Sequence, residues 1–285
     1  MRLLKQLRYD FYAGTRSNRI WYIGFAVIIL SILFMFKHKV DVANTYVTMT
    51  NPSFLDYVIE IMKGKKILQP NFIKLGESFS LPAEWVFMQF YLYLMLSIYP
   101  KKDFEVRGYQ FFIRSQSIYE WWISKCIWVI VNILLYYAIF YGMVFICCML
   151  QGNITLGPNI EITKVMFGID VSNLNLAEIF VSTIGTPVLA SIALGMIELG
   201  ISFLFTPTIA VLIILIYLVM SVYYCNPYMI GNYTQVYRNA LVVGSGGVGN
   251  VQGILICCFL ILFNMIVGYI FLKHTDLIHR QDSRS

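Results

Sequence analysis

The chain has 285 residues, 59% of them hydrophobic and only 13% charged, with a formal net charge of +6. Ordinary soluble domains carry about 25% charged residues and could not bury this much apolar surface, so we expect an all-α integral membrane protein with a single transmembrane domain. The basic residues flank apolar runs instead of forming one stripe, which argues against nucleic-acid binding.

The amino-terminal segment, residues 1–19, is basic and amphipathic and leads directly into an apolar run. That run ends at "FMFKHKV" without the small-residue cleavage pattern of a secretory signal. We therefore predict a retained first transmembrane span after a cytoplasmic amino-terminal segment.

Six apolar segments have enough length to cross about 30 Å of hydrocarbon as helices. Only "TP" at Thr206–Pro207 interrupts the apolar stretch between the fourth and fifth segments, where we predict a tight hairpin because one continuous helix would far exceed the membrane. The six predicted spans are about 20–36, 83–99, 126–150, 177–203, 207–224 and 253–272.

The distribution of Lys and Arg predicts the orientation of these spans. Residues 1–19 and the loop 101–125 are rich in basic residues, whereas the loops after the third and fifth spans contain only Lys164 and Arg238. This places both termini, the loop 101–125 and the tail 273–285 in the cytoplasm. The lysines of the first outer loop, residues 37–82, weigh against this orientation, but the two later loops decide it.

Within the outer loop 37–82, apolar residues recur at helical spacing from Phe54 to Met62, and Gly64 is a natural helix stop. We expect a short amphipathic helix here that lies at the outer membrane surface. A helix packed over the ends of the spans explains the same pattern.

Motifs for bond chemistry are missing from the predicted spans, so we expect no enzyme activity from this chain. The glycine-rich stretch 242–250 lacks the Lys of a phosphate-binding loop and reads as a flexible or re-entrant outer turn. The six cysteines and three histidines have no metal-ligand spacing, so we predict no metal site. Glu198 is the only acidic residue well inside a predicted span, which suits either a structural role or a role in a transport pathway or its coupling.

The loop 101–125, "KKDFEVRGYQFFIRSQSIYEWWISK", is unusually dense in charged and aromatic residues. We interpret it as a short helix-turn-helix whose apolar members lie against the bilayer. Its charged members Arg107, Arg114 and Glu120 then face the cytoplasm or a partner. An amphipathic helix that only anchors the interface is the alternative.

In its six spans, cytoplasmic termini and loop elements Glu-x-x-Gly and Arg-Ser-x-Ser, the chain resembles the permease subunits of type-2 ABC exporters. The segment 207–233 also resembles the fifth span and following outer loop of small exporter permeases of low-GC Gram-positive bacteria. Gln116 stands where the family often has Pro in the serine turn. The loop pattern falls on Glu105, Gly108, Arg114, Ser115, Ser117, Trp121, Ser124 and Lys125.

The resemblance implies a half-transporter in the plasma membrane that pairs with a second permease subunit. Separate ABC ATPase subunits, which bind ATP and Mg²⁺, would dock on the loop between spans two and three as a coupling helix, with residues 1–19 along the inner surface beside them. The expected cargo is amphipathic or hydrophobic, first of all a bacteriocin-like peptide toxin. A membrane immunity or sensor subunit and an ion-coupled carrier are the alternatives.

Overall fold

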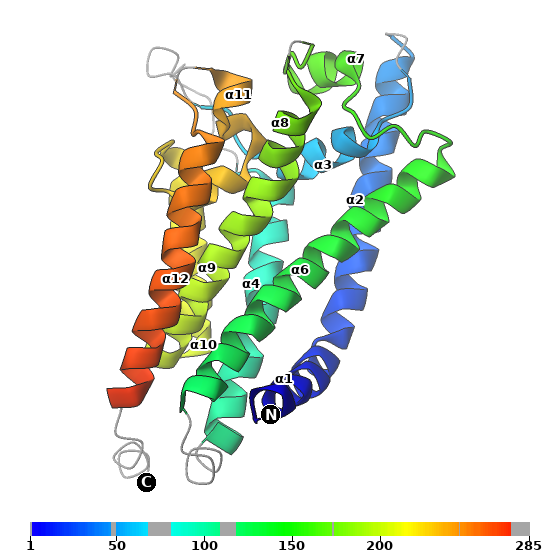
Figure 1. Cartoon of the computed structure of the whole chain (residues 1–285). Helices are drawn as coiled ribbons and strands as arrows, with labels where there is room; N and C mark the ends of the chain where they lie inside the picture. The colour runs from blue at the N-terminus through cyan, green and yellow to red at the C-terminus, as the bar shows by residue number, and fades with distance from the viewer. Residues whose placement is uncertain are drawn as a thin grey trace.

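The computed structural model describes residues 2–46, 50–67, 81–108, 118–172, 174–244 and 246–274, and within these ranges it contains helices and no β-strand. The long helices form a bundle, and the short ones lie at its two ends (Figure 1). The longer elements are α1 (Arg2–Asp10), α2 (Arg19–Asn44), α3 (Phe54–Met62), α4 (Ala83–Asp103), α6 (Ile118–Leu150), α9 (Thr186–Leu204), α10 (Pro207–Tyr223) and α12 (Asn250–His274). The shorter ones used below are η1 (Phe11–Thr15), η3 (Phe104–Gly108), α8 (Leu176–Phe180), η5 (Val181–Gly185), η6 (Ile230–Thr234), η7 (Val236–Arg238) and α11 (Ala240–Val243).

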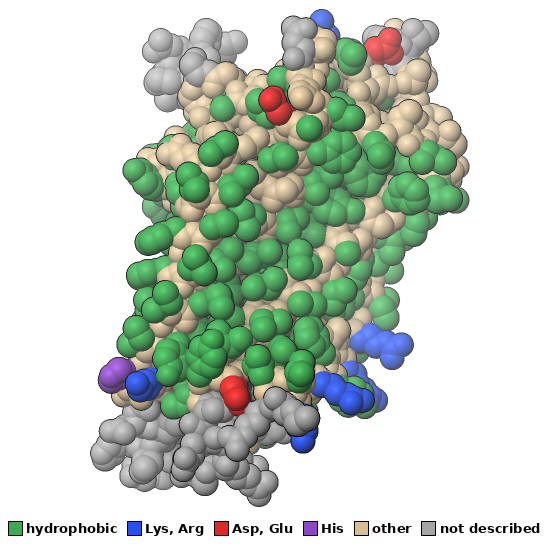
Figure 2. Space-filling model, in the orientation of Figure 1, with side chains coloured by type: hydrophobic (Ala, Val, Ile, Leu, Met, Phe, Trp, Pro, Cys, Tyr) green, Lys and Arg blue, Asp and Glu red, His purple; other side chains and the backbone are tan. Residues whose placement is uncertain are grey.

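Four helical segments of the described chain are long and apolar enough to cross a bilayer, which makes this a membrane protein. Hydrophobic side chains cover the middle of the face in Figure 2, while Lys and Arg gather at the end where α1 lies. The four segments are Arg19–Asn44, Ile118–Leu150, Leu176–Leu204 and Asn250–His274.

Two of the six predicted spans, α4 and α10, fall short of the length or the apolarity of these four segments. Helix α10 has 17 residues and is too short for it. Helix α4 has 21 residues, but Glu84, Gln89 and several tyrosines lower its hydropathy. Many of its side chains, polar Gln89 among them, are buried against other helices, so this helix has less need of an apolar surface.

Several helices extend beyond the predicted spans, and the helices on either side of the predicted loop 101–125 reach into it. Helix α4 continues to Asp103 and α6 already begins at Ile118, so the segment between them is 104–117. Helix α6 begins before the predicted span because Trp121, Trp122 and Lys125 lie on its buried face and pack inside the protein.

The predicted hairpin at Thr206–Pro207 is confirmed. Thr206 is the N-cap of α10, and its hydroxyl accepts a hydrogen bond from the backbone N–H of Ile209 at 3.3 Å. Pro207 occupies the first turn, where the missing N–H costs no helical hydrogen bond. Helices α9 and α10 therefore lie side by side as an antiparallel pair (Figure 1).

Helix α3 is confirmed, but it lies inside the protein and not on an exposed surface, because all nine of its residues are buried. A capping box between Ser53 and Asp56 begins the helix, and Gly64, with a φ of 67°, follows its end. The Ser53 amide and hydroxyl each donate to the Asp56 carboxylate at 2.8 Å, and the Asn159 amide donates at 3.1 Å. Burial raises the pKa of Asp56 to about 6, although these hydrogen bonds act in the opposite direction.

The glycine-rich stretch forms a turn closed by backbone hydrogen bonds. The Val248 amide donates to the Arg238 carbonyl at 2.7 Å, and the Ala240 amide donates to the Val248 carbonyl at 3.0 Å. Arg238, which the sequence places in an outer loop, is buried, and its guanidinium donates to the carbonyl of Val222 at the end of α10.

The bundle has two distinct ends (Figure 1). We call the end that holds α1, η3 and the last turn of α12 the α1 end, and the opposite one, which holds α3, α8 and α11, the α3 end. The predicted cytoplasmic segments within the described chain all lie at the α1 end, and the predicted outer loops all lie at the α3 end.

Candidate functional site

The predicted coupling loop leaves the bundle at the α1 end, between η3 and the start of α6. Glu105 is exposed there, and Glu120 is half-buried in the first turn of α6. Arg107 and Gly108 belong to the π-helical turn η3 that continues α4. The remaining predicted contact residues, Arg114, Ser115 and Ser117, lie outside the described residues, as does Gln116.

Trp121 is buried at the start of α6 among other aromatic rings. Its ring lies 5.4 Å from the ring of Phe104 in η3 and 5.7 Å from that of Phe203 in α9. This aromatic cluster joins the two sides of the loop to the end of α9.

Lys125 also lies inside the protein, at the centre of a buried ion cluster that links three helices. Its Nζ lies 2.6 Å from Asp10 Oδ1 on α1 and 2.6 Å from Asp103 Oδ2 on α4. The side chains of Lys125 and Asp10 have no exposed surface, and that of Asp103 is 4% exposed. Two carboxylates and one ammonium therefore meet away from solvent.

Further polar and aromatic groups complete this cluster. The hydroxyls of Ser124 and Tyr99 donate to the Asp10 carboxylate at 2.5 and 2.9 Å. The rings of Tyr99 and Trp121 lie with their centroids 4.8 and 5.1 Å from the Lys125 ammonium. Such hydrogen bonds and cation–π contacts offset part of the cost of removing the charges from water.

A second lysine links α4 to the hairpin between α9 and α10. The ammonium of Lys101 is buried and donates to the carbonyls of Ser202 at 2.9 Å and Phe205 at 2.8 Å. The carbonyls at a helix end lack intrahelical partners, so a buried cation is well placed there. Four helices, α1, α4, α6 and α9, are thus connected at the α1 end through two lysines, one of which also binds the turn that leads into α10.

The two acidic residues of this cluster, Asp10 and Asp103, have no role assigned from the sequence. A signal was present, because Asp10 is the only acidic residue of the basic segment 1–19. Gly14, one turn later, is also buried, and its backbone lies against Tyr99 and Trp128. A lone acid on the inward side of a basic helix indicates a buried cation opposite it.

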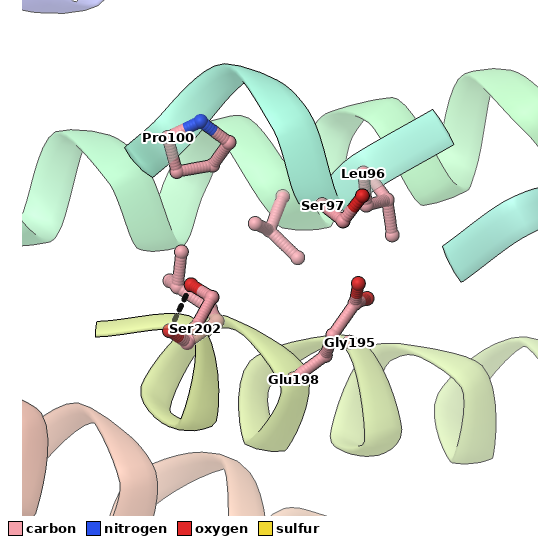
Figure 3. Close-up of a pocket in the computed structure, with 8 residues that line it drawn as sticks. Leu96, Ser97, Pro100, Gly195, Glu198 and Ser202 are labelled. Atoms are coloured by element: carbon pink, nitrogen blue, oxygen red, sulfur yellow. Dashed lines mark hydrogen bonds between the residues drawn. The ribbon is translucent and has the colours of Figure 1, made fainter. Parts of the chain in front are cut away.

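Glu198 lies deeper in the bundle, on α9, with 1% of its surface exposed. Figure 3 shows its carboxylate pointing from α9 toward Leu96 and Ser97 on α4. Neither carboxylate oxygen has a hydrogen-bond partner among the described residues. Glu198 lies within the fourth predicted span, on the half of α9 that leads to the α1 end.

A polar network fills the space between α4, α6 and α9 farther from the α1 end. Tyr137 and Ser191 form a hydrogen bond at 2.8 Å, and the Gln89 amide donates to Tyr137 at 3.3 Å. The Tyr93 hydroxyl donates to the Gln89 carbonyl oxygen, also at 3.3 Å. These buried groups satisfy one another, and Glu198 has no such partner.

The part of the chain that the structure describes contains neither a metal-binding cluster nor a disulfide bond. No group of three or more His, Cys, Asp or Glu side chains there could hold a metal ion. All six cysteines are free thiols. Four of them are buried, Cys225 is half-buried, and Cys258 is exposed on α12.

At the α1 end, charged side chains occur both on the surface and in the interior of the protein. It presents exposed acidic and basic side chains around a loop, and behind them it has a dry set of ion pairs that holds α1, α4 and α6 together. Comparison with protein-family models, with curated proteins and with solved structures finds no match for this chain.

Proposed function

We propose that this chain is the membrane subunit of an ATP-driven exporter of the type-2 ABC class. In this proposal α4 and α10 are membrane spans beside the four long apolar segments, and the α1 end faces the cytoplasm of a cell whose plasma membrane contains the protein. Separate ATPase subunits supply ATP and Mg²⁺, and a second permease subunit, a copy or a relative, completes the pathway.

The observation that carries the proposal is the connection behind the predicted coupling loop. Glu105 is exposed at the start of the loop, while Lys125 just behind its end binds Asp10 and Asp103. A displacement of the loop would therefore move the ends of α1, α4 and α6 together. The Lys101 bonds would carry the same displacement to α9 and α10.

The cargo class follows from the interior of the bundle. The interface of α4, α6 and α9 is packed with apolar side chains and with neutral polar groups such as Gln89, Tyr137 and Ser191, which would line a pathway when these helices separate. Such a lining suits an amphipathic molecule better than a small ion, and an amphipathic peptide is our first candidate. We disfavour an ion-coupled carrier because charged groups are rare in this region.

The test is to co-express the chain with the ABC ATPase encoded in a neighbouring reading frame and to reconstitute both in lipid nanodiscs. We expect the ATPase to co-purify with the chain and its ATP hydrolysis to rise. The charge reversals Glu105→Lys and Arg114→Glu should remove most of this stimulation while membrane insertion stays unchanged, because they act at the docking surface.

The matched control is Glu161→Lys, a charge reversal of an exposed glutamate at the α3 end, which should leave the stimulation intact. If the ATPase does not bind the wild-type chain, the exporter assignment is wrong, and an immunity or sensor subunit becomes the better description. If it binds but both loop reversals leave hydrolysis unchanged, the docking surface lies elsewhere.

A further inference from the structure

The surroundings of Glu198 indicate a binding site that is independent of ATPase docking. Glu198 is 1% exposed, and both of its carboxylate oxygens lack a hydrogen-bond donor among the described residues. A buried carboxylate that remains ionised without a cation or donors is costly, so such groups usually mark a functional site.

A small cavity lies directly at this carboxylate, between α4, α6 and α9 (Figure 3). Its volume is about 10 Å³, close to what one water molecule occupies. Helix α4 contributes Leu96, Ser97 and Pro100 to its wall, and α9 contributes Ser202 beside Glu198 itself. The cavity has no room for a peptide or a lipid chain, so its ligand must be very small.

The polar atoms around the cavity are hydrogen-bond acceptors. Pro100 has no N–H, so the carbonyl of Leu96 one turn earlier lacks its usual intrahelical donor. The Ser97 hydroxyl already donates to the Leu94 carbonyl at 3.0 Å, and the Ser202 hydroxyl donates to the Leu199 carbonyl at 2.7 Å. Both hydroxyl hydrogens are therefore used within their own helices, and the Leu96 carbonyl has none to give.

The buried cations on the neighbouring helices are already engaged, and Lys102 on α4 and Lys273 on α12 are exposed. Lys101 donates to two backbone carbonyls, and Lys125 binds two aspartates. The other titratable groups that reach α9 or interact with its surroundings are two phenols and a thiol: Tyr93 on α4, Tyr137 on α6 and Cys257 on α12. Phenols and thiols are neutral near physiological pH and give a carboxylate no counter-charge.

We infer that Glu198 is a proton-binding site at the interface of α4 and α9, where the neutral carboxyl donates its own O–H to an acceptor on α4. The bound proton supplies the one hydrogen that the site lacks. When the proton leaves, a carboxylate faces only lone pairs and apolar side chains, so water must enter or α4 and α9 must separate. The site therefore links the protonation of one residue to the packing of two helices.

The experiment is infrared spectroscopy of the full chain in lipid nanodiscs, with glutamate alone labelled by ¹³C at the side-chain carboxyl. At neutral pH we expect the C=O stretch of a protonated, labelled carboxyl in the wild type. The band should be lost in Glu198→Gln and in Glu198→Asp, because an aspartate carries no label yet keeps a carboxyl in the fold. It should persist in Glu178→Gln, which changes an exposed glutamate at the start of the same span.

Two outcomes would overturn the inference. The first is a wild-type spectrum without a protonated glutamate band at neutral pH, which would show that Glu198 is ionised. The second is a band that survives in Glu198→Asp, which would assign the proton to another glutamate.

Discussion

Replacing Lys125 by Met tests whether the ion cluster at the α1 end holds the helices together. Methionine keeps the length and apolar volume of the lysine stem but removes the ammonium. Asp10 and Asp103, each 2.6 Å from that ammonium in the wild type, then remain as two buried carboxylates without their shared cation. Like charges that face each other in a dry site repel, and neither retains its main partner.

The size of the effect follows from this geometry. Removing one partner of a buried ion pair typically costs about 3–5 kcal/mol, because the other charge stays buried and uncompensated. Two charge-assisted hydrogen bonds at about 1.5–3 kcal/mol each give a sum in the same range. Ser124 and Tyr99 still donate to Asp10, which keeps the expected loss near the lower end. We therefore expect Lys125→Met to lose about 3 kcal/mol of unfolding free energy.

The assay is equilibrium unfolding in mixed micelles, combined with limited proteolysis of the α1 segment. The double-mutant cycle with Asp10→Asn should return a coupling energy of about 2 kcal/mol, since the two side chains are in direct contact. α1 should become accessible to protease in Lys125→Met before the rest of the bundle. A loss below about 1 kcal/mol, the value of an exposed ion pair, would refute the burial of this cluster.

Two further predictions concern other parts of the molecule. Lys101→Met should lose about 2 kcal/mol of unfolding free energy, because two buried carbonyls lose a charged donor. The control is Lys102→Met at the exposed neighbouring position. In the same unfolding assay it should change the free energy by less than about 0.5 kcal/mol. For Asp56, the folded-state pKa of about 6 lies above the ordinary value of 3.8, so its protonated form stabilises the fold below pH 3.8 and this contribution is lost as the pH rises through 6. A thermal-stability series across that window should show a decline worth up to about 3 kcal/mol, and Asp56→Asn should flatten it; a wild-type stability that does not fall across the window would contradict the argument.

The sequence predicts the parts of this fold that depend on local chemistry. Apolar length identifies the four long membrane segments, and the Thr206–Pro207 pair places the hairpin because it combines an N-cap with a first-turn proline. Gly64 ends α3 as expected, because glycine adopts the left-handed conformation easily. These features need no knowledge of which helices are neighbours.

The buried charges could not be predicted in the same way. Lys125 and Arg238 count as surface residues when basic residues are summed by loop, yet both are buried, and their partners come from residues far away in the chain. The partner of Lys125 on α1 is separated from it by 115 positions. Only tertiary packing brings these groups together, and the docking roles of Arg114, Ser115 and Ser117 stay predictions.

The last turn of α4 contributes both to the packing of the bundle and to the candidate functional site. Successive residues of a helix point about 100° apart, so a single turn faces several neighbours. Pro100 lines the cavity at Glu198, Lys101 reaches the hairpin of α9 and α10, and Asp103 binds Lys125 on α6. A helix so enclosed by protein needs polar residues where a lipid-facing helix needs apolar ones, and this is why α4 falls below the apolarity of the other long helices. A movement of its last turn would change the proton site, the hairpin contact and the ion cluster at once.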